Sequence, residues 1–217
     1  RCLRRVRPVG GYFKHNEHSL RVVEVLERDG TGLNLTAPVR DGILNHTGPQ
    51  EPQTLEGKVV RIVDRVAYIN HDIDDAVRAG LLDERELPRE PIAVLGSTGS
   101  ARIDALVHDM VERSQAAGDI VQGPQAGPAM DVLRDFMFAE VYLAPAVRAE
   151  HRRIAGVVRR LFEHYVEHPH ELPDGVGSEI ADERELAQRV TDYLAGMTDR
   201  YCIARFSELE VPQAFAR

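Results

Sequence analysis

The chain has 217 residues, of which 43% are hydrophobic and 29% charged, which fits one globular domain, or one domain with an appendage. Its 27 basic and 35 acidic residues give a formal net charge of −8, which argues against broad electrostatic binding to nucleic acid or anionic lipid. No apolar run approaches the roughly 20 residues of a membrane span, and no signal peptide opens the chain. Cys2 and Cys202 form neither a CxxC pair nor a disulfide framework, so we expect a soluble, cytoplasmic protein.

The sequence begins with Arg1 rather than Met, in the basic stretch RCLRRVR. We expect residues 1–10 to be a basic N-terminal stretch internal to a longer protein, followed by a single region over residues 11–217. This stretch by itself would suit a helical nucleic-acid binder, an interpretation that the net charge of −8 disfavours.

Apolar residues recur throughout at i, i+3 and i+4, whereas the alternating pattern of strands is nearly absent. The pattern predicts an all-α protein, in the form of a compact helical bundle. The strongest helix begins after Thr54 and ends at Gly80. The other helices are expected over residues 16–28, 36–46, 100–117, 129–143, 146–167 and 182–206. Between them lie predicted breaks at residues 47–53, 88–99 and 168–177 and a Gly- and Pro-rich flexible loop at 118–128.

The most informative segment of the chain reads DRVAYINHDIDD. On a helix, its residues Asp64, Tyr68 and Asp72 fall at i, i+4 and i+8 and form one polar stripe. Two carboxylates and a phenol along one line suit a site that holds a divalent metal ion and hydrogen-bonds a polyol or a phosphate. The alternative is a solvated face stabilised by ion pairs such as Asp74 with Arg78.

A second candidate lies at the start of the first helix, in FKHNEHSLR. There His15 suits a general acid, or an electrostatic partner of a leaving phosphate. The alternative is that His15 and Asn16 cap the helix.

A third candidate lies in LRDFMFAEVY, where Arg134, Phe138 and Tyr142 recur at i, i+4 and i+8 on an apolar helix. An arginine on such a helix is costly to bury unless it meets an anion, and phosphate matches its fork of donors. The alternative is that Arg134 pairs with Glu140 or Asp135, or extends to solvent.

Taken together, these segments resemble the deoxyguanosinetriphosphate triphosphohydrolase family of HD-domain phosphohydrolases. The resemblance covers nearly the whole chain, from Gly11 to Phe206, and its most specific part is TLEG…D-x3-Y-x3-HDIDD. The matching stretches, in family order, are GYFKHNEHSLRVVEVLE, GLNLTAPVRDGILNHTG, TLEGKVVRIVDRVAYINHDIDDAVRAGLL, LRDFMFAEVYL and VTDYLAGMTDRYCIARF.

The resemblance implies an all-helical enzyme of the HD-domain phosphohydrolase type. Such an enzyme uses a divalent metal ion, Mg²⁺ or Mn²⁺, held by a His, a His-Asp dyad and a later Asp. It cleaves a deoxynucleoside triphosphate to the nucleoside and inorganic triphosphate. The resemblance also implies a cytoplasmic homo-oligomer.

Carried over by motif, the resemblance assigns roles to four residues of the strongest helix. Asp64 looks like the last metal ligand, and Arg65 lies where some members place a basic phosphate contact. Tyr68 and Asp72 correspond to positions that line the deoxyribose and phosphate pocket. Elsewhere in the chain, His15 matches a pocket histidine near the phosphates, Arg134 the arginine that holds the triphosphate, and Tyr142 the tyrosine stacked near the sugar.

The sequence departs from the family pattern at its beginning. The family's first histidine, its His-Asp dyad and its catalytic H-x-x-E stretch lie upstream of the segment that starts at Gly11, and residues 1–10 do not supply them. The dipeptide His71-Asp72 cannot replace the dyad, because it belongs to the downstream helix of the same pattern. We therefore expect this chain to be the C-terminal two-thirds of such an enzyme. Hydrolysis of the deoxynucleoside triphosphate is then expected to require the upstream segment. The alternative is a non-catalytic subunit that binds nucleotides or a partner.

Overall fold

The computed structural model describes residues 13–173 and 180–212, and all of the regular structure within them is helical. The all-α prediction is therefore confirmed. The described residues divide into two compact units, one of residues 14–147 and one of residues 148–173 and 180–212 with residue 13. The basic stretch at residues 1–10 and the end of the predicted break at 168–177 lie outside the described residues.

The first unit contains the segments in which the candidate site residues lie. Its elements are α1 (His15–Arg21), η1 (Val22–Leu26), α2 (Glu27–Gly30), α3 (Ala37–Asn45), α4 (Leu55–Arg78), η2 (Glu84–Glu86), α5 (Arg89–Leu95), α6 (Gly99–Ala117), α7 (Ala126–Phe136) and η3 (Met137–Tyr142). Of the η elements, η1 and η3 are π-helical and η2 is a 3-10 turn. The second unit contains most of α8 (Pro145–Glu167), with η4 (Pro169–Glu171), α9 (Glu183–Ala195) and α10 (Asp199–Glu210).

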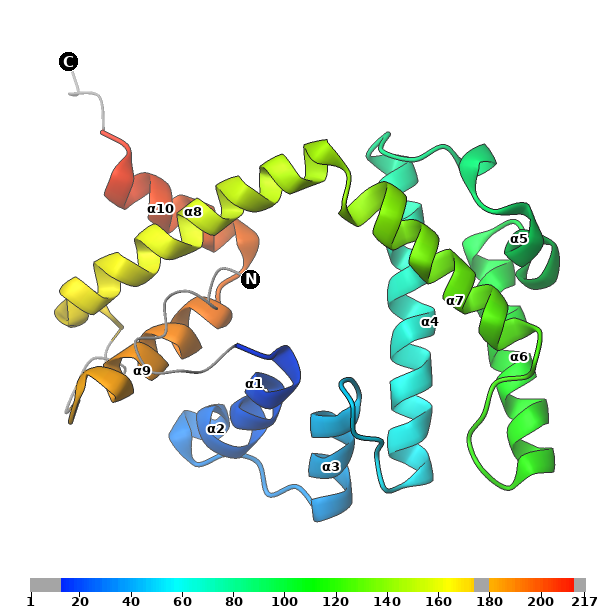
Figure 1. Cartoon of the computed structure of the whole chain (residues 1–217). Helices are drawn as coiled ribbons and strands as arrows, with labels where there is room; N and C mark the ends of the chain where they lie inside the picture. Colours follow the sequence, from blue (N-terminus) through cyan, green and yellow to red (C-terminus); the bar gives the residue numbers. More distant parts are fainter. Residues whose placement is uncertain (1–12, 174–179, 213–217) are drawn as a thin grey trace. The chain divides into compact units, whose positions relative to one another are not determined.

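The long helix α4 is the centre of the first unit, with α3 on one side and α6 and α7 on the other (Figure 1). It begins where the sequence predicts, because the Oγ1 of Thr54 accepts a hydrogen bond from the amide of Gly57 at 3.1 Å. It ends before Gly80, whose φ of +68° takes the chain out of the helix. Its buried face packs into the core of the unit through residues including Ile69 and Ile73, each 1% exposed.

A buried arginine joins α6 to α4. Arg102 is 1% exposed, and its Nε donates to the Oδ1 of Asn70 at 2.7 Å. The amide nitrogen of Asn70 donates in turn to the carbonyl of Val66 at 2.8 Å. A guanidinium nitrogen of Arg102 donates to the carbonyl of Ser97 at 3.2 Å, and another lies 3.6 Å from Asp74. These partners satisfy the buried cation, and desolvation lowers its pKa.

The predicted first helix, residues 16–28, is wrong at its end. The α-helical part stops at Arg21, a π-helical turn follows, and Arg28 and Asp29 have φ of 52° and 55° in the left-handed region. The chain then crosses closely over η1 at Gly32, where φ is +71° and a Cβ would lie 2.1 Å from the carbonyl oxygen of Glu24. Only glycine fits both conditions. The apolar spacing alone cannot show that the chain reverses here.

Three other boundaries also differ from the sequence prediction. The helix predicted over 182–206 is two helices, because the chain turns at Gly196 and Thr198 caps α10 through a bond from the amide of Tyr201. The break predicted at 88–99 contains the short helix α5. The loop predicted at 118–128 ends earlier, where α7 begins at Ala126.

The backbone of that loop is attached to α6. The amide of Gly123 donates to Oδ2 of Asp109 at 2.6 Å, and the amide of Val121 donates to the Ser114 hydroxyl at 2.9 Å. The flexibility expected of this loop stays a prediction.

The second unit has its own core, in which Leu161, Tyr165 and Val190 are each at most 1% exposed. The hydroxyl of Tyr165 accepts a hydrogen bond from Nε of Arg205 at 3.1 Å.

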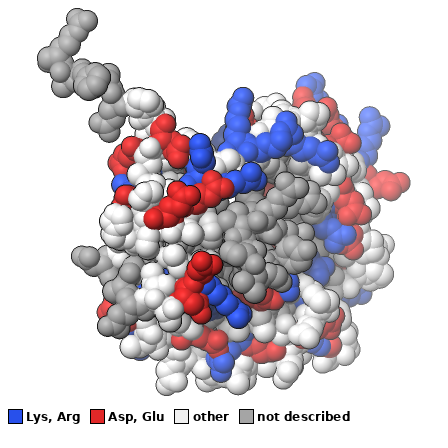
Figure 2. All heavy atoms as spheres, turned by 60° about the vertical axis from the view of Figure 1, so that its left-hand side comes forward, with Lys and Arg blue, Asp and Glu red and all other residues white. Residues whose placement is uncertain are grey.

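On the face drawn in Figure 2, basic and acidic side chains lie beside one another. None of the described helices combines the length and the apolar character that a membrane span needs.

Candidate functional site

The candidate site begins with the polar stripe on α4. Asp64 is exposed, whereas Tyr68 and Asp72 are half-buried between α4 and its neighbours. The opposite face of the same helix holds the buried Val66 and Ile73. The stripe predicted from the i, i+4, i+8 spacing therefore lies at the edge of the core, where side chains are partly desolvated and still accessible.

A hydrogen bond connects this stripe to the next candidate segment. The hydroxyl of Tyr142, at the end of η3, donates to Oδ2 of Asp72 on α4. The ring of Tyr142 packs edge-on against that of Phe138, with ring centroids 5.0 Å apart. The amide of Leu143 donates to the carbonyl of Phe138 at 3.1 Å, the i to i+5 bond of a π-turn. Because each residue of such a turn rotates less than in an α-helix, the turn changes the direction in which Tyr142 points.

The pKa of Tyr68 is affected by charged side chains of both signs. Burial raises the pKa of its hydroxyl, and the nearby carboxylates of Asp64 and Asp72 raise it further. The guanidinium groups of Arg134 and Arg65 lower the same pKa. Because the net direction is upward, Tyr68 stays a neutral phenol that can donate a hydrogen bond to a sugar or phosphate oxygen. Two carboxylates and two guanidinium groups therefore act on this phenol together.

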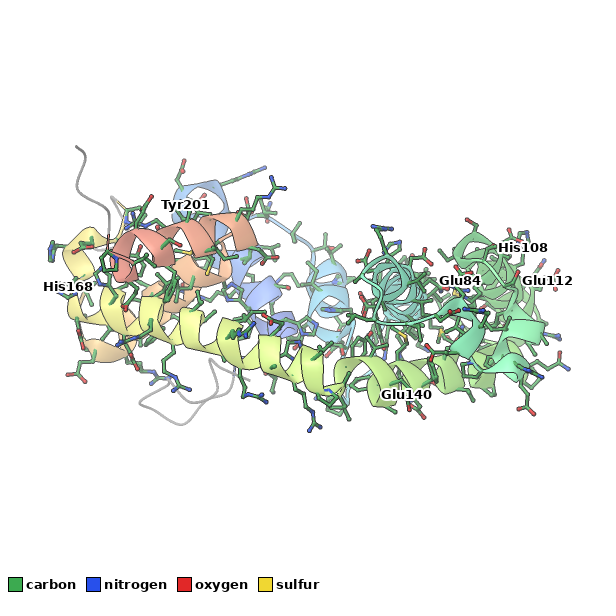
Figure 3. All side chains as sticks on the ribbon, turned by 90° about the horizontal axis from the view of Figure 1, so that it is seen from above. Glu84, His108, Glu112, Glu140, His168 and Tyr201 are labelled. Carbon is green, nitrogen blue, oxygen red and sulfur yellow. The ribbon has the colours of Figure 1, made fainter. Side chains whose placement is uncertain are left out.

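Arg134 already has anionic partners on its own helix. Its guanidinium lies 3.0 Å from Asp131 and 3.1 Å from Asp135, and its side chain is 32% exposed. Pairing with Asp135 was the alternative interpretation of the sequence, and it is present; Glu140 instead lies on the outer side of η3, away from α4 (Figure 3). The hydrogen bond that Arg134 donates to the carboxylate of Asp135 raises the pKa of Arg134. Two partly exposed ion pairs hold the arginine loosely, so a polyanionic ligand can compete for it.

His15 meets another histidine rather than capping α1. Its Nε2 lies 3.1 Å from Nε2 of His46, the residue that follows α3. The N-cap of α1 is Lys14, whose side chain makes no capping hydrogen bond, and Asn16 donates to the carbonyl of Leu44 at 2.7 Å. The capping interpretation of His15 and Asn16 is therefore wrong.

The ion pair between Asp74 and Arg78, suggested from the sequence as the alternative for the α4 stripe, does not match the observed partners. Arg78 pairs with Asp75 at 3.2 Å, and Asp74 turns toward Arg102. On the neighbouring helix α6, His108 and Glu112 point outward into solvent (Figure 3).

Comparison with known proteins identifies the family to which this chain is similar. Residues 120–208 match the family model of the phosphohydrolase-associated domain. The deoxyguanosinetriphosphate triphosphohydrolase-like protein of Roseobacter denitrificans is 30% identical over 263 residues, which cover 93% of this chain and 68% of that protein. The chain belongs to the deoxyguanosinetriphosphate triphosphohydrolase-like family.

Other members of the deoxyguanosinetriphosphate triphosphohydrolase-like family are more similar in sequence. The member from Clostridium perfringens (strain 13 / Type A) is 42% identical over 212 residues, covering 94% of this chain and 62% of that protein. The member from Caldanaerobacter subterraneus subsp. tengcongensis is 41% identical over 202 residues, covering 93% and 59%. The chain thus spans about three-fifths of the length of these two relatives.

The resemblance to this phosphohydrolase family implies a divalent metal ion, and the described residues do not form a complete site for one. In residues 13–173 and 180–212, no three His, Cys, Asp or Glu side chains are grouped so that they could hold a metal. Asp64 is exposed and offers a single carboxylate. A hydrolase metal site needs several protein ligands or a substrate phosphate in addition. The ligand role of Asp64 stays a prediction, and we derive no step through a metal ion.

Most of the residues selected from the sequence are brought together by the fold of the deoxyguanosinetriphosphate triphosphohydrolase-like chain. Six of them are linked to one another, either by the hydrogen bond between Tyr142 and Asp72 or by their electrostatic effects on the pKa values of Tyr68 and Tyr142. They are Asp64, Arg65, Tyr68, Asp72, Arg134 and Tyr142. His15 belongs to the same unit and is paired with His46, which the sequence reasoning missed. It also missed Asn70 and Arg102, because no local spacing relates residues on different helices.

Proposed function

We propose that a protein carrying this chain hydrolyses deoxynucleoside triphosphates, dGTP among them, to the nucleoside and inorganic triphosphate. The observation that supports this proposal best is the hydrogen bond between Tyr142 and Asp72, which joins η3 to the polar stripe of α4. The pKa of Tyr68 on that stripe responds to two arginines and two carboxylates. Membership in the deoxyguanosinetriphosphate triphosphohydrolase-like family supports the same substrate class.

The arginines would bind the triphosphate. Arg134 projects from α7 and Arg65 from α4, and both act on the Tyr68 hydroxyl. Guanidinium groups from two different helices can contact more than one phosphate of a chain, through charge-assisted hydrogen bonds. In this arrangement a triphosphate displaces the carboxylates of Asp131 and Asp135 from Arg134.

The phenols and Asp72 would form the sugar end of the site. Tyr142 directs its hydroxyl to Asp72, so this carboxylate keeps one fixed orientation and its remaining lone pairs can accept from sugar hydroxyls. Tyr68 presents a neutral hydroxyl next to it. His15 would contact a phosphate, and Asp64 would serve as one ligand of a divalent ion, Mg²⁺ or Mn²⁺, together with ligands outside the described residues.

The test is a product analysis. The whole protein is incubated with dGTP and with each other deoxynucleoside triphosphate, in the presence of Mg²⁺ or Mn²⁺, and the products are separated by anion-exchange chromatography. We expect nucleoside and triphosphate in equal amounts. Release of pyrophosphate or of single phosphate would show that the reaction is a different one.

A second candidate function is nucleotide binding without turnover, alone or as a subunit of an intact partner. It is favoured by the single candidate metal ligand that the described residues supply. In the same experiment this function leaves dGTP intact while equilibrium dialysis detects the bound nucleotide. A cytoplasmic location and assembly into a homo-oligomer, both expected from the resemblance, are likewise proposals.

A further inference from the structure

Two histidines from different elements face each other near the start of the first unit. The Nε2 atoms of His15 and His46 are 3.1 Å apart, and their ring planes cross at 62° with centroids 5.1 Å apart. At this distance two imidazole nitrogens share one proton, which one ring donates and the other accepts. The direction of this hydrogen bond decides which nitrogen of His15 is left for a ligand.

The second nitrogen of His46 settles the direction. Its Nδ1 lies 2.7 Å from the carbonyl oxygen of Ile43. A carbonyl oxygen only accepts hydrogen bonds, so Nδ1 of His46 carries the proton. In a neutral imidazole the other nitrogen then has a lone pair, so Nε2 of His46 accepts and Nε2 of His15 donates. The free nitrogen of His15 is Nδ1.

Side-chain hydrogen bonds to backbone carbonyls hold the two segments that carry these rings. Asn16, next to His15, donates to the carbonyl of Leu44 at 2.7 Å, two residues before His46. On the other side, the guanidinium of Arg61 on α4 donates to the carbonyl of Asn45 at 2.8 Å and to that of Gly48 at 2.7 Å. The start of α1 and the chain around His46 are thus both tied to neighbouring elements.

We propose that His46 is a positioning residue for His15: by accepting from Nε2–H it directs Nδ1 of His15 toward the phosphates of a deoxynucleoside triphosphate. The contact with phosphate rests on the proposed function, whereas the protonation pattern of the two rings does not. A phosphate oxygen only accepts hydrogen bonds, so a direct hydrogen bond from His15 to a phosphate requires the imidazolium form, with a proton on Nδ1 as well as on Nε2. The Nε2–H of this imidazolium still donates to His46. The arrangement resembles other histidines whose second nitrogen is oriented by a hydrogen-bond partner.

The protonation pattern is measured directly by two-bond ¹H–¹⁵N spectra of the imidazole rings, recorded on the whole protein at about pH 8.5, where histidines are ordinarily neutral. We expect His46 to be protonated on Nδ1, the form less common in free histidine, and His15 on Nε2. In the protein without nucleotide, a proton on Nε2 of His46, or a neutral His15 protonated on Nδ1 instead of Nε2, overturns the proposal. The variant His108→Gln, on the outward side of α6, is the control and should leave both sets of signals unchanged.

A matched pair of variants tests the consequence for activity. His46→Gln places an amide where Nε2 was, so an acceptor for His15 remains while the bond to Ile43 is lost. His46→Asn places its amide where Nδ1 was, so the bond to Ile43 remains while the acceptor for His15 is lost. We expect the kcat for dGTP to fall about tenfold in His46→Asn and to stay within about threefold of the parent in His46→Gln.

Equal losses in the two variants, or the larger loss in His46→Gln, contradict the proposal. Thermal melting of both proteins checks that the comparison is made on folded chains. If the whole protein does not hydrolyse deoxynucleoside triphosphates, the proposed function fails, and the ring spectra still decide the role of His46.

Discussion

The hydroxyl of Tyr142 donates a hydrogen bond to the carboxylate of Asp72, a residue 70 positions earlier in the chain. This bond joins the end of the α7–η3 helix to the polar stripe of α4. Burial and the bond to Asp72 both raise the pKa of Tyr142, so its hydroxyl keeps the proton that it donates. Removing this one bond therefore tests whether the orientation of the Asp72 carboxylate matters to the site.

The variant Tyr142→Phe keeps the ring contact with Phe138 and removes only the hydroxyl. We expect the free energy of unfolding to fall by about 0.5–1.5 kcal/mol and the kcat/KM for dGTP to fall about tenfold or more. Urea denaturation and steady-state kinetics measure the two effects.

The control for Tyr142→Phe is Tyr193→Phe, which removes a comparable hydroxyl from the second unit. Tyr193 lies 3.0 Å from the hydroxyl of Tyr201. This control should leave kcat/KM for dGTP unchanged. A similar loss of activity in both variants would mean that the Asp72 contact has no special part in the site.

Arg134 should bind triphosphate through the fork of its guanidinium. We expect Arg134→Gln to weaken the binding of inorganic triphosphate about tenfold or more, and Arg134→Lys to recover only part of that loss, because an ammonium cannot make the bidentate contact. Isothermal titration calorimetry measures both dissociation constants.

The comparison variant for Arg134 is Arg78→Gln on α4, which also removes one guanidinium group. The Arg78 side chain is 77% exposed and pairs with Asp75. If Arg78→Gln weakens triphosphate binding as much as Arg134→Gln does, Arg134 contributes only general electrostatic attraction.

The link between α4 and α6 should depend on Asn70 much more than on Asp74. Asn70→Ala removes the acceptor of the buried Arg102 Nε, so we expect a loss of about 1–3 kcal/mol in the free energy of unfolding. Asp74→Ala removes a half-exposed partner at 3.6 Å, for which we expect about 0–1 kcal/mol. Urea denaturation of the two variants measures the difference, and a reversed order would show that the ion pair, rather than the buried hydrogen bond, is the main link.

Cys202 should react slowly with thiol reagents. Burial raises the pKa of its thiol, and the Asp199 carboxylate adds to the effect. A raised pKa means less thiolate at a given pH, so at pH 8 a Cys2→Ser variant should be modified by iodoacetamide more slowly than free cysteine, with a rate that increases only at higher pH. If Cys202 is modified as fast as free cysteine, its thiol is not buried and its pKa is not raised.

Those helix limits that depend on neighbouring residues in the sequence could be predicted. The start of α4 follows from Thr54 and its end from Gly80, because capping and termination act within one turn. The end of the first helix could not be predicted, since Arg28 and Asp29 adopt left-handed conformations that are uncommon for residues other than glycine. The chain also passes close to Glu24 at Gly32, which is a contact between segments that apolar spacing does not show.

The candidate site divides in the same way. The sequence by itself determined that Asp64, Tyr68 and Asp72 share one face of a helix, because helical periodicity relates residues four apart. Only the tertiary structure decided that Tyr142 bonds to Asp72, that Arg134 acts on Tyr68, and that His15 meets His46. Such contacts between elements depend on how helices pack and on where a π-turn redirects a side chain, and neither is encoded in local spacing.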